Sequence, residues 1–395
     1  MRARVRNKAR ALATICAAGL GLSACGGFSL NPVDWFSRSE APKPAPLVNI
    51  DKPVAQRVLW QAKVGNSPSA GFVPVLVQGN VYAAGQDGSV IRIDERTGRE
   101  IWRIKLPSTL SAGVGTNGKV SAVGTTEGEV VALDENGRVL WRARVSSEVL
   151  APPAVINDLV VVRSADSRLF AFDTRDGKRR WVYQRAAASL SVRSAVGLAV
   201  RNGIAFSGFP GGKLVAVSLN NGGLRWEAAV ALPKGTTELE RVTDVIGVPW
   251  LGDREVCAVA FQGRVACFDL NTGGGLWARE MSSSSGLTAD GRYVFVSEER
   301  GAVSALDRGT GNSLWRQDKL ANRNLSAPLS LGDRVAIGDV EGYVHLLARD
   351  TGHFVGRQAT DGSPIYSAPI SIADGYLVQT ANGNLYAIAQ VAAAP

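Results

Sequence analysis

The residue types that most often carry chemistry are scarce in this chain of 395 residues. His345 and His353 are its only histidines, so a catalytic triad or a histidine metal site has almost nothing to draw on. His345 alternates with Val344 and Leu346, which favours a structural role within a strand. Carboxylates are plentiful, but most recur at one place in a repeated turn, and no acid and base pair stands out. We therefore expect no catalytic residue, no metal and no cofactor.

The two cysteines in the second half of the chain can be interpreted in two ways. Cys257 and Cys267 lie on consecutive predicted strands joined by a turn at 261–264, so they face each other directly or diagonally in one hairpin. In an oxidising compartment this placement permits a disulfide. The alternative is that both are small apolar side chains that fill a sheet.

The N-terminus has the pattern of a secretory signal. Residues 1–10 carry five positive charges and no negative ones, and residues 11–22 form an apolar run too short to span a membrane. The run ends in Leu-Ser-Ala-Cys-Gly at 22–26, which resembles the lipobox of bacterial lipoproteins. That resemblance implies cleavage after residue 24 and acylation of Cys25, with Gly26 favouring the outer membrane. Several acyl chains would anchor the protein stably on the periplasmic face. The alternative is an ordinary signal cleaved nearby.

Removal of residues 1–24 also changes the charge. The formal net charge of +9 falls to +4, which gives no support to a nucleic-acid partner. Residues 25–52 are rich in Pro, Ser and Gly, and we interpret them as the acylated cysteine followed by a flexible tether.

The rest of the chain repeats one unit, which is clearest at 301–315 as Gly-Ala-Val-Ser-Ala-Leu-Asp-Arg-Gly-Thr-Gly-Asn-Ser-Leu-Trp. An alternating strand ends in Asp307, a Thr-Gly turn follows, and a second strand carries Trp315. Asp307 can accept hydrogen bonds from the turn amides, and Gly311 can take a positive φ. The Asp position recurs at intervals of 38 to 51 residues, at Asp94, Asp134, Asp173, Ser218, Asp269, Asp307, Ala348 and Ala389.

These eight units predict an all-β fold, an eight-bladed β-propeller of four-stranded blades. In the seventh unit Gly356 stands where the Trp is expected, and the eighth unit stops near Gln390, before its Trp strand. The missing strand is predicted at 57–60, where Trp60 follows an apolar pair, so an N-terminal strand completes the last blade and closes the ring. The propeller is expected over 53–391, with a tail at 392–395. An open β-solenoid is the alternative.

Two long connections stand out from the repeat. Residues 184–197 contain Leu190, Ser191, Val192 and Arg193, and the insertion at 233–244 contains Glu240, Arg241 and Asp244. Both occupy the same repeat position in consecutive units, so they are predicted to lie side by side on one rim of the ring. Apolar residues beside mixed charges suit a protein interface. Variable solvent loops without function are the alternative.

Taken together, the lipobox, the tether, the eight repeats and the segments 190–193 and 240–245 resemble the BamB family, lipoproteins of the outer-membrane β-barrel assembly machinery. The resemblance implies a non-enzymatic scaffold that binds the POTRA domains of the barrel subunit BamA and helps deliver unfolded outer-membrane proteins. It maps the family's Leu-Ser-Leu-Arg contact segment onto Leu190, Ser191, Val192 and Arg193, and its acidic loop onto Asp244. A second family aspartate corresponds to Ile246 here.

Two other functions are compatible with the same repeat. Quinoprotein dehydrogenases share it, and they resemble one another in a vicinal Cys-Cys ring that this chain lacks. A propeller lipoprotein that binds another periplasmic partner is the third interpretation.

Overall fold

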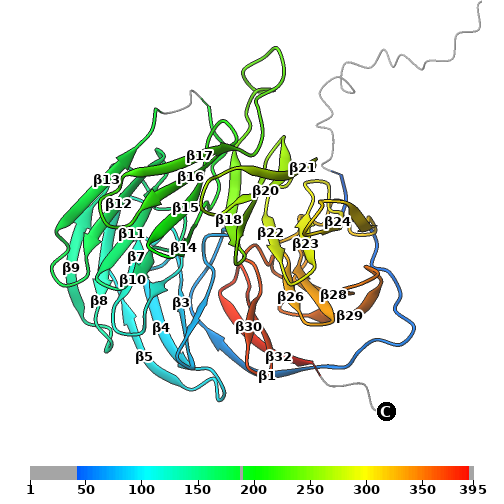
Figure 1. The fold of residues 1–395 in the computed structure, drawn as a ribbon. Coiled ribbons are helices and arrows are strands. Elements are labelled where there is room, and N and C mark those ends of the chain that lie inside the picture. Colours follow the sequence, from blue (N-terminus) through cyan, green and yellow to red (C-terminus); the bar gives the residue numbers. More distant parts are fainter. Residues whose placement is uncertain (1–41, 187–189, 391–395) are drawn as a thin grey trace, which may run out of the picture. The chain divides into compact units, whose positions relative to one another are not determined.

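The computed structural model describes residues 42–186 and 190–390. Within these residues, 32 strands form eight four-stranded antiparallel sheets. The sheets stand as blades around a common axis (Figure 1). No helix in the described part of the chain is long and apolar enough to cross a membrane.

Each blade is built from strands that follow one another along the chain. Blades 1 to 4 consist of β2 (Val75–Val77), β3 (Asn80–Ala84), β4 (Ser89–Asp94) and β5 (Glu100–Lys105); β6 (Gly115–Thr116), β7 (Ser121–Gly124), β8 (Glu129–Leu133) and β9 (Val139–Arg144); β10 (Ala154–Ile156), β11 (Leu159–Ser164), β12 (Arg168–Asp173) and β13 (Arg179–Gln184); and β14 (Leu198–Arg201), β15 (Ile204–Phe209), β16 (Lys213–Ser218) and β17 (Leu224–Ala229). Blades 5 to 8 consist of β18 (Val245–Leu251), β19 (Glu255–Ala260), β20 (Arg264–Asp269) and β21 (Gly275–Glu280); β22 (Gly286–Ala289), β23 (Tyr293–Ser297), β24 (Val303–Asp307) and β25 (Ser313–Gln317); β26 (Leu329–Leu331), β27 (Arg334–Gly338), β28 (Tyr343–Ala348) and β29 (Phe354–Ala359); and β30 (Ile370–Ile372), β31 (Gly375–Gln379) and β32 (Asn384–Gln390) with β1 (Gln56–Lys63).

The ring closes as the sequence predicts. β1 pairs antiparallel with β32, from Gln56 opposite Gln390 to Lys63 opposite Asn384, and supplies the outer strand of blade 8. The first strands of neighbouring blades contact one another around the ring, including β30 of blade 8 with β2 of blade 1. The prediction of an eight-bladed propeller closed by an N-terminal strand is therefore confirmed.

Because adjacent strands are antiparallel, successive connections lie on two opposite rims of the ring. One rim carries the connection from each blade to the next together with the turn between the second and third strands of each blade, and we call it the loop rim. The opposite rim carries the remaining turns. Each of the eight apolar clusters among the described residues lies between two adjacent blades, so blade-to-blade packing forms the core.

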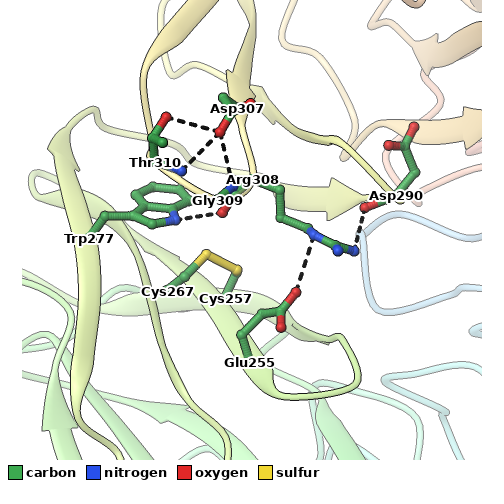
Figure 2. Close-up of a disulfide and its surroundings, with 9 residues drawn as sticks. All are labelled: Glu255, Cys257, Cys267, Trp277, Asp290, Asp307, Arg308, Gly309 and Thr310. Atoms are coloured by element: carbon green, nitrogen blue, oxygen red, sulfur yellow. Dashed lines mark hydrogen bonds and ion pairs between the residues drawn. A yellow bond between two sulfur atoms is a disulfide. The ribbon is translucent and has the colours of Figure 1, made fainter.

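The repeated turn joins neighbouring blades, as Figure 2 shows for blades 5 and 6. One carboxylate oxygen of Asp307 accepts hydrogen bonds from the Gly309 and Thr310 backbone N–H groups, at 3.1 and 2.9 Å. Gly311 has φ +71°, and a Cβ there would lie 2.5 Å from the ring of Trp277, so only glycine fits. The Trp277 indole donates to the Arg308 carbonyl at 2.7 Å and ties blade 5 to the turn of blade 6.

The same indole bond recurs wherever the repeat has its Trp. The other bonds run from Trp60 to the carbonyl of Glu95, Trp102 to Glu135, Trp141 to Thr174, Trp181 to Leu219, Trp226 to Leu270 and Trp315 to Arg349, at 2.7 to 3.1 Å. Gly356 of blade 7 breaks the pattern, and a Cβ there would lie 3.3 Å from the Gln56 side chain and 3.5 Å from the Val54 carbonyl. The N-terminal segment thus occupies the space that the missing Trp leaves.

Residues 43–54, which we call the strap, correct the predicted tether boundary. The sequence assigns 25–52 to a flexible tether, but the Ala45 N–H donates to the Ala321 carbonyl at 2.9 Å, and the Val54 N–H donates to the Val355 carbonyl at 2.7 Å. Ala321 belongs to the connection between blades 6 and 7, so the strap begins at the loop rim and runs along the outer strand β29. The propeller therefore holds the chain from about Lys43, and the composition of this segment gave no sign of its hydrogen bonds.

A buried polar cluster holds the strap. Arg323 donates to the Ala45 carbonyl at 2.6 Å and to the Asp339 carboxylate at 2.7 Å, although its side chain is almost fully buried. Arg357 donates to the Val48 carbonyl at 2.9 Å and, through Nε, to Nδ1 of His345 at 3.3 Å. The ring proton of His345 therefore lies on Nε2, which is 2.8 Å from Asp339, and burial lowers the pKa of the imidazole. His345 has a structural role, as its strand pattern indicates.

Cys257 and Cys267 face each other on β19 and β20, with Cα atoms 4.1 Å apart, and the structure joins them by a disulfide. The disulfide lies near Trp277 in Figure 2. Of the two interpretations that the sequence leaves open, the structure adopts the disulfide.

Candidate functional site

The two long connections lie next to each other on the loop rim. The described residues 185–186 and 190–197 belong to the connection from blade 3 to blade 4, and residues 230–244 join blade 4 to blade 5 (Figure 1). Leu190 from the first connection and Pro233 and Arg241 from the second line one depression of about 300 Å³. The predicted juxtaposition of the two loops is present in the structure.

Asp244 joins the two loops from beneath. Its Oδ2 accepts a hydrogen bond from the Val192 N–H at 2.6 Å, and its Oδ1 accepts one from the Gly211 N–H at 3.2 Å. The residue is only 4% exposed. Burial raises the pKa of Asp244, while the two hydrogen bonds and the nearby charge of Arg163 act in the opposite direction.

The burial of Asp244 favours a different role from the one that the resemblance implies. The resemblance places it among the residues that contact a partner, but both carboxylate oxygens are engaged inside the protein. We infer that Asp244 holds the segment 190–193 in position. Ile246, at the position of the second family aspartate, is 3% exposed and packs between blades 5 and 6 with Cys257 and Val259.

The segment 190–193 presents both apolar surface and a cation. Leu190 is 46% exposed, Ser191 is exposed, and Val192 is half-buried above Asp244. The Arg193 side chain is 68% exposed, and its Nη2 donates to both carboxylate oxygens of Glu148 at 2.7 Å. Arg193 therefore pairs with Glu148, from the connection between blades 2 and 3, and not with Asp244 beside it.

The remaining predicted residues lie on the insertion. Glu240 is exposed, but its carboxylate accepts hydrogen bonds from the Thr236 and Thr237 N–H groups at 2.9 and 3.1 Å, so it shapes its own loop. Arg241 is exposed. Leu239, which the sequence pattern does not single out, is 72% exposed, whereas Val242 of the same insertion is buried.

The site is thus a surface of the loop rim on which Leu190, Arg193 and Leu239 protrude. No group of three or more His, Cys, Asp or Glu side chains in the described part of the chain is placed to hold a metal ion. Exposed apolar side chains next to an arginine on a rigid scaffold are the features that protein interfaces use for anchors.

Comparison with known proteins supports a family assignment. The family described as "Outer membrane protein assembly factor BamB" matches residues 50–110, 86–317 and 299–393. The chain is 48% identical to the protein of that name from Nitrosomonas eutropha over 282 residues, which cover 71% of this chain and 69% of the relative. It is 42% identical to the Bordetella pertussis protein of the same name over 321 residues, with 81% of each chain covered.

Solved structures give a matching result. The crystal structure of BamB from Moraxella catarrhalis superposes with a TM-score of 0.78 at 26% identity and covers 85% of this chain and all of that one. A quinohemoprotein alcohol dehydrogenase from Comamonas testosteroni gives a TM-score of 0.66 at 14% identity, covering 86% of this chain and 77% of that one. The likeness to the dehydrogenase concerns the fold alone.

Proposed function

Because this chain belongs to the BamB family of outer membrane protein assembly factors, we propose that it is a non-enzymatic scaffold lipoprotein that binds the POTRA domains of BamA. In this role it assists the insertion of β-barrel proteins into the outer membrane. The partner docks on the loop rim, where the connections 185–197 and 230–244 meet.

One observation carries the proposal: Asp244 fixes the segment 190–193 while leaving Leu190 and Arg193 exposed. A segment that is already ordered loses little conformational entropy on binding, so its contacts contribute more fully to affinity. Arg193 is held on one side by Glu148, and such an arginine is well suited to pair with a partner carboxylate or carbonyl group.

Attachment to the membrane is the second part of the proposal. Cys25 lies outside the described residues, and we propose that it is acylated and that the tether joins the propeller at the strap, on the loop rim. The Cys25→Ala variant is expected to move from the membrane fraction to the soluble periplasmic fraction with its melting temperature unchanged. Retention of this variant in the outer membrane after a high-salt wash would contradict the lipid anchor.

The binding role is tested by recovering the tagged lipoprotein from detergent-solubilised envelopes and identifying what accompanies it. We expect BamA, and we expect its recovery to fall sharply with Arg193→Ala but not with Arg96→Ala, a change in the turn after β4 on the opposite rim. Recovery of a different envelope protein without BamA would contradict the proposal. Alcohol oxidation that appears on addition of quinone and calcium would contradict the non-enzymatic role.

A further inference from the structure

A second cavity lies beneath the segment 190–193 on the loop rim. It has a volume of about 130 Å³, and Arg163, Arg193, Ser194 and Asp244 are among the residues that line it. A single water needs only roughly 10–15 Å³, so this cavity has room for a small polar group such as a carboxylate. We call it the Arg163 pocket.

Arg163 is the unusual residue of this pocket. It lies on β11 of blade 3, is only 9% exposed, and stacks on the ring of Phe209 with its guanidinium carbon 5.4 Å from the ring centre. Its side chain forms no hydrogen bond or ion pair with any residue that the structure describes, and its Nε is buried without a partner. The Ser194 hydroxyl is also buried there without a partner among the described residues. Two sets of donors thus line the pocket with no acceptor from the described part of the chain.

The nearby carboxylates do not neutralise Arg163 by direct contact. Asp244 uses its oxygens to accept from the Val192 and Gly211 N–H groups, and Asp166 accepts from the Ser164 hydroxyl and pairs with Arg168. Both act on Arg163 only through longer-range attraction. Burial lowers the pKa of Arg163 to about 10, which leaves the guanidinium charged at neutral pH.

Burying the Arg163 guanidinium in this way costs free energy unless a ligand accepts its hydrogen bonds. A buried guanidinium without hydrogen-bond acceptors has lost its water and gained little in return. Arginine presents a planar fork that matches a carboxylate, and a neighbouring hydroxyl can supply a further donor. Arg193 lines the pocket, and Asp244 lines both this pocket and the neighbouring depression that contains Leu190.

We propose that the Arg163 pocket receives the carboxylate of an aspartate or glutamate side chain from the protein that docks on the loop rim. The Arg163 guanidinium and the Ser194 hydroxyl donate to this carboxylate, while Arg193 closes the entrance. This inference rests on the proposed function, because it requires the partner to dock on this rim. It adds a buried charge contact to a surface whose other anchors are exposed.

The test compares Arg163→Met with wild type and with Arg96→Met, a control on the opposite rim that removes the same charge. The affinity of the purified propeller for the BamA POTRA domains is measured together with the melting temperature of each protein. We expect Arg163→Met to bind about thirtyfold more weakly or worse, since loss of one member of a buried charge pair has an effect of that order. The control should bind normally. Methionine removes an unpaired buried charge, so the melting temperature should stay the same or rise.

If Arg163→Met does not fold, competition by acetate tests the same pocket in the wild-type protein. Sodium acetate should weaken POTRA binding by wild type more than sodium chloride at equal ionic strength, because acetate competes for the pocket whereas both salts screen charge. A carboxylate-to-amide scan of the POTRA domains should find one acidic residue whose loss mimics Arg163→Met and adds nothing to it.

The outcomes separate the two proposals. If Arg193→Ala weakens binding while Arg163→Met binds normally and acetate acts like chloride, the pocket proposal is wrong and the docking rim stands. If wild type itself does not bind the POTRA domains, the proposed function is wrong, and so is the pocket proposal that depends on it. A folded Arg163→Met protein with a clearly lowered melting temperature and normal affinity would assign Arg163 a purely structural role.

Discussion

Removal of the Asp244 carboxylate tests whether this residue acts from inside the protein. Asp244→Ala leaves the Val192 and Gly211 N–H groups without an acceptor. An unsatisfied buried donor costs about 1–3 kcal/mol, but both donors here are only partly buried, and the substitution also relieves the burial of a charge. We expect a net loss of about 1–3 kcal/mol in the free energy of unfolding. For a propeller of this size the unfolding entropy is roughly 0.7 kcal/mol per degree, so the melting temperature should fall by about 1–4 °C.

The same substitution should release the segment 190–193 and weaken partner binding in parallel. Hydrogen exchange measured by mass spectrometry should show faster exchange over 190–196, because the Val192 amide loses its acceptor. Asp244→Asn, which keeps one acceptor oxygen, should produce smaller changes in melting, exchange and affinity.

Asp253→Ala provides the matched control, because Asp253 is 98% exposed and lies on the opposite rim, where its ion pair with Arg201 is at the surface. It should leave melting, exchange over 190–196 and affinity unchanged. If Asp244→Ala abolished binding with unaltered melting and exchange, Asp244 would have to contact the partner directly, and the reasoning above would be refuted.

Two further predictions concern the ring and the strap. Trp60→Ala removes a buried side chain and its indole bond to Glu95, so we expect a loss of about 3–5 kcal/mol by calorimetry or chemical denaturation, and unchanged stability would show that the ring does not depend on this strand. Burial holds the pKa of His345 below its ordinary value of about 6.5 in the folded protein, so its contribution to stability is present above that pH and is lost as the pH falls through it. The melting temperature of wild type should therefore fall more than that of His345→Gln between about pH 7.5 and 5, and parallel pH profiles would contradict this assignment.

The architecture could be predicted from the sequence because each blade is specified locally. Asp307, the turn glycine and the Trp of one unit lie within nine residues of one another, and their spacing recurs along the chain. The N-terminal strand that completes blade 8 was also predictable, since the last unit lacks a Trp strand and Trp60 lies in an apolar run without preceding strands. Closure of the ring then follows from strand pairing, without any specific long-range contact having to be known.

The site could be predicted only in part, because its decisive contacts cross between blades. Arg193 meets Glu148 and Val192 meets Asp244, 45 and 52 residues apart, and these pairings depend on how adjacent blades are set around the ring. Repeat position was enough to bring the loops together but not to say which side chains are buried. The sequence feature that could have indicated the Arg163 pocket is the arginine itself, which ends the apolar strand run Val-Val-Val-Arg at 160–163.

The strap escaped prediction for a different reason. Its contacts are made mainly by backbone carbonyl groups, which accept from Asn322, Arg323 and Arg357 at 2.6 to 3.3 Å. Side-chain composition carries little information about such contacts, so a Pro-rich segment that is held by its backbone has the same composition as a free linker. The substitution of Gly356 for the expected Trp was the one visible sign that something else fills this space.

The most direct test of the central claim is the affinity of the purified propeller for the BamA POTRA domains, measured for wild type and for Arg193→Ala together with their melting temperatures. Arg193 is largely exposed and its ion pair with Glu148 lies at the surface, so its loss should change stability by only about 0–1 kcal/mol. Truncation of an interface anchor costs roughly 2 kcal/mol or more, and an arginine that pairs bidentately with the partner should cost more than that minimum. We predict a loss of about thirtyfold or more in affinity with nearly unchanged melting. Unaltered affinity would contradict the account of the loop rim as the partner-binding surface.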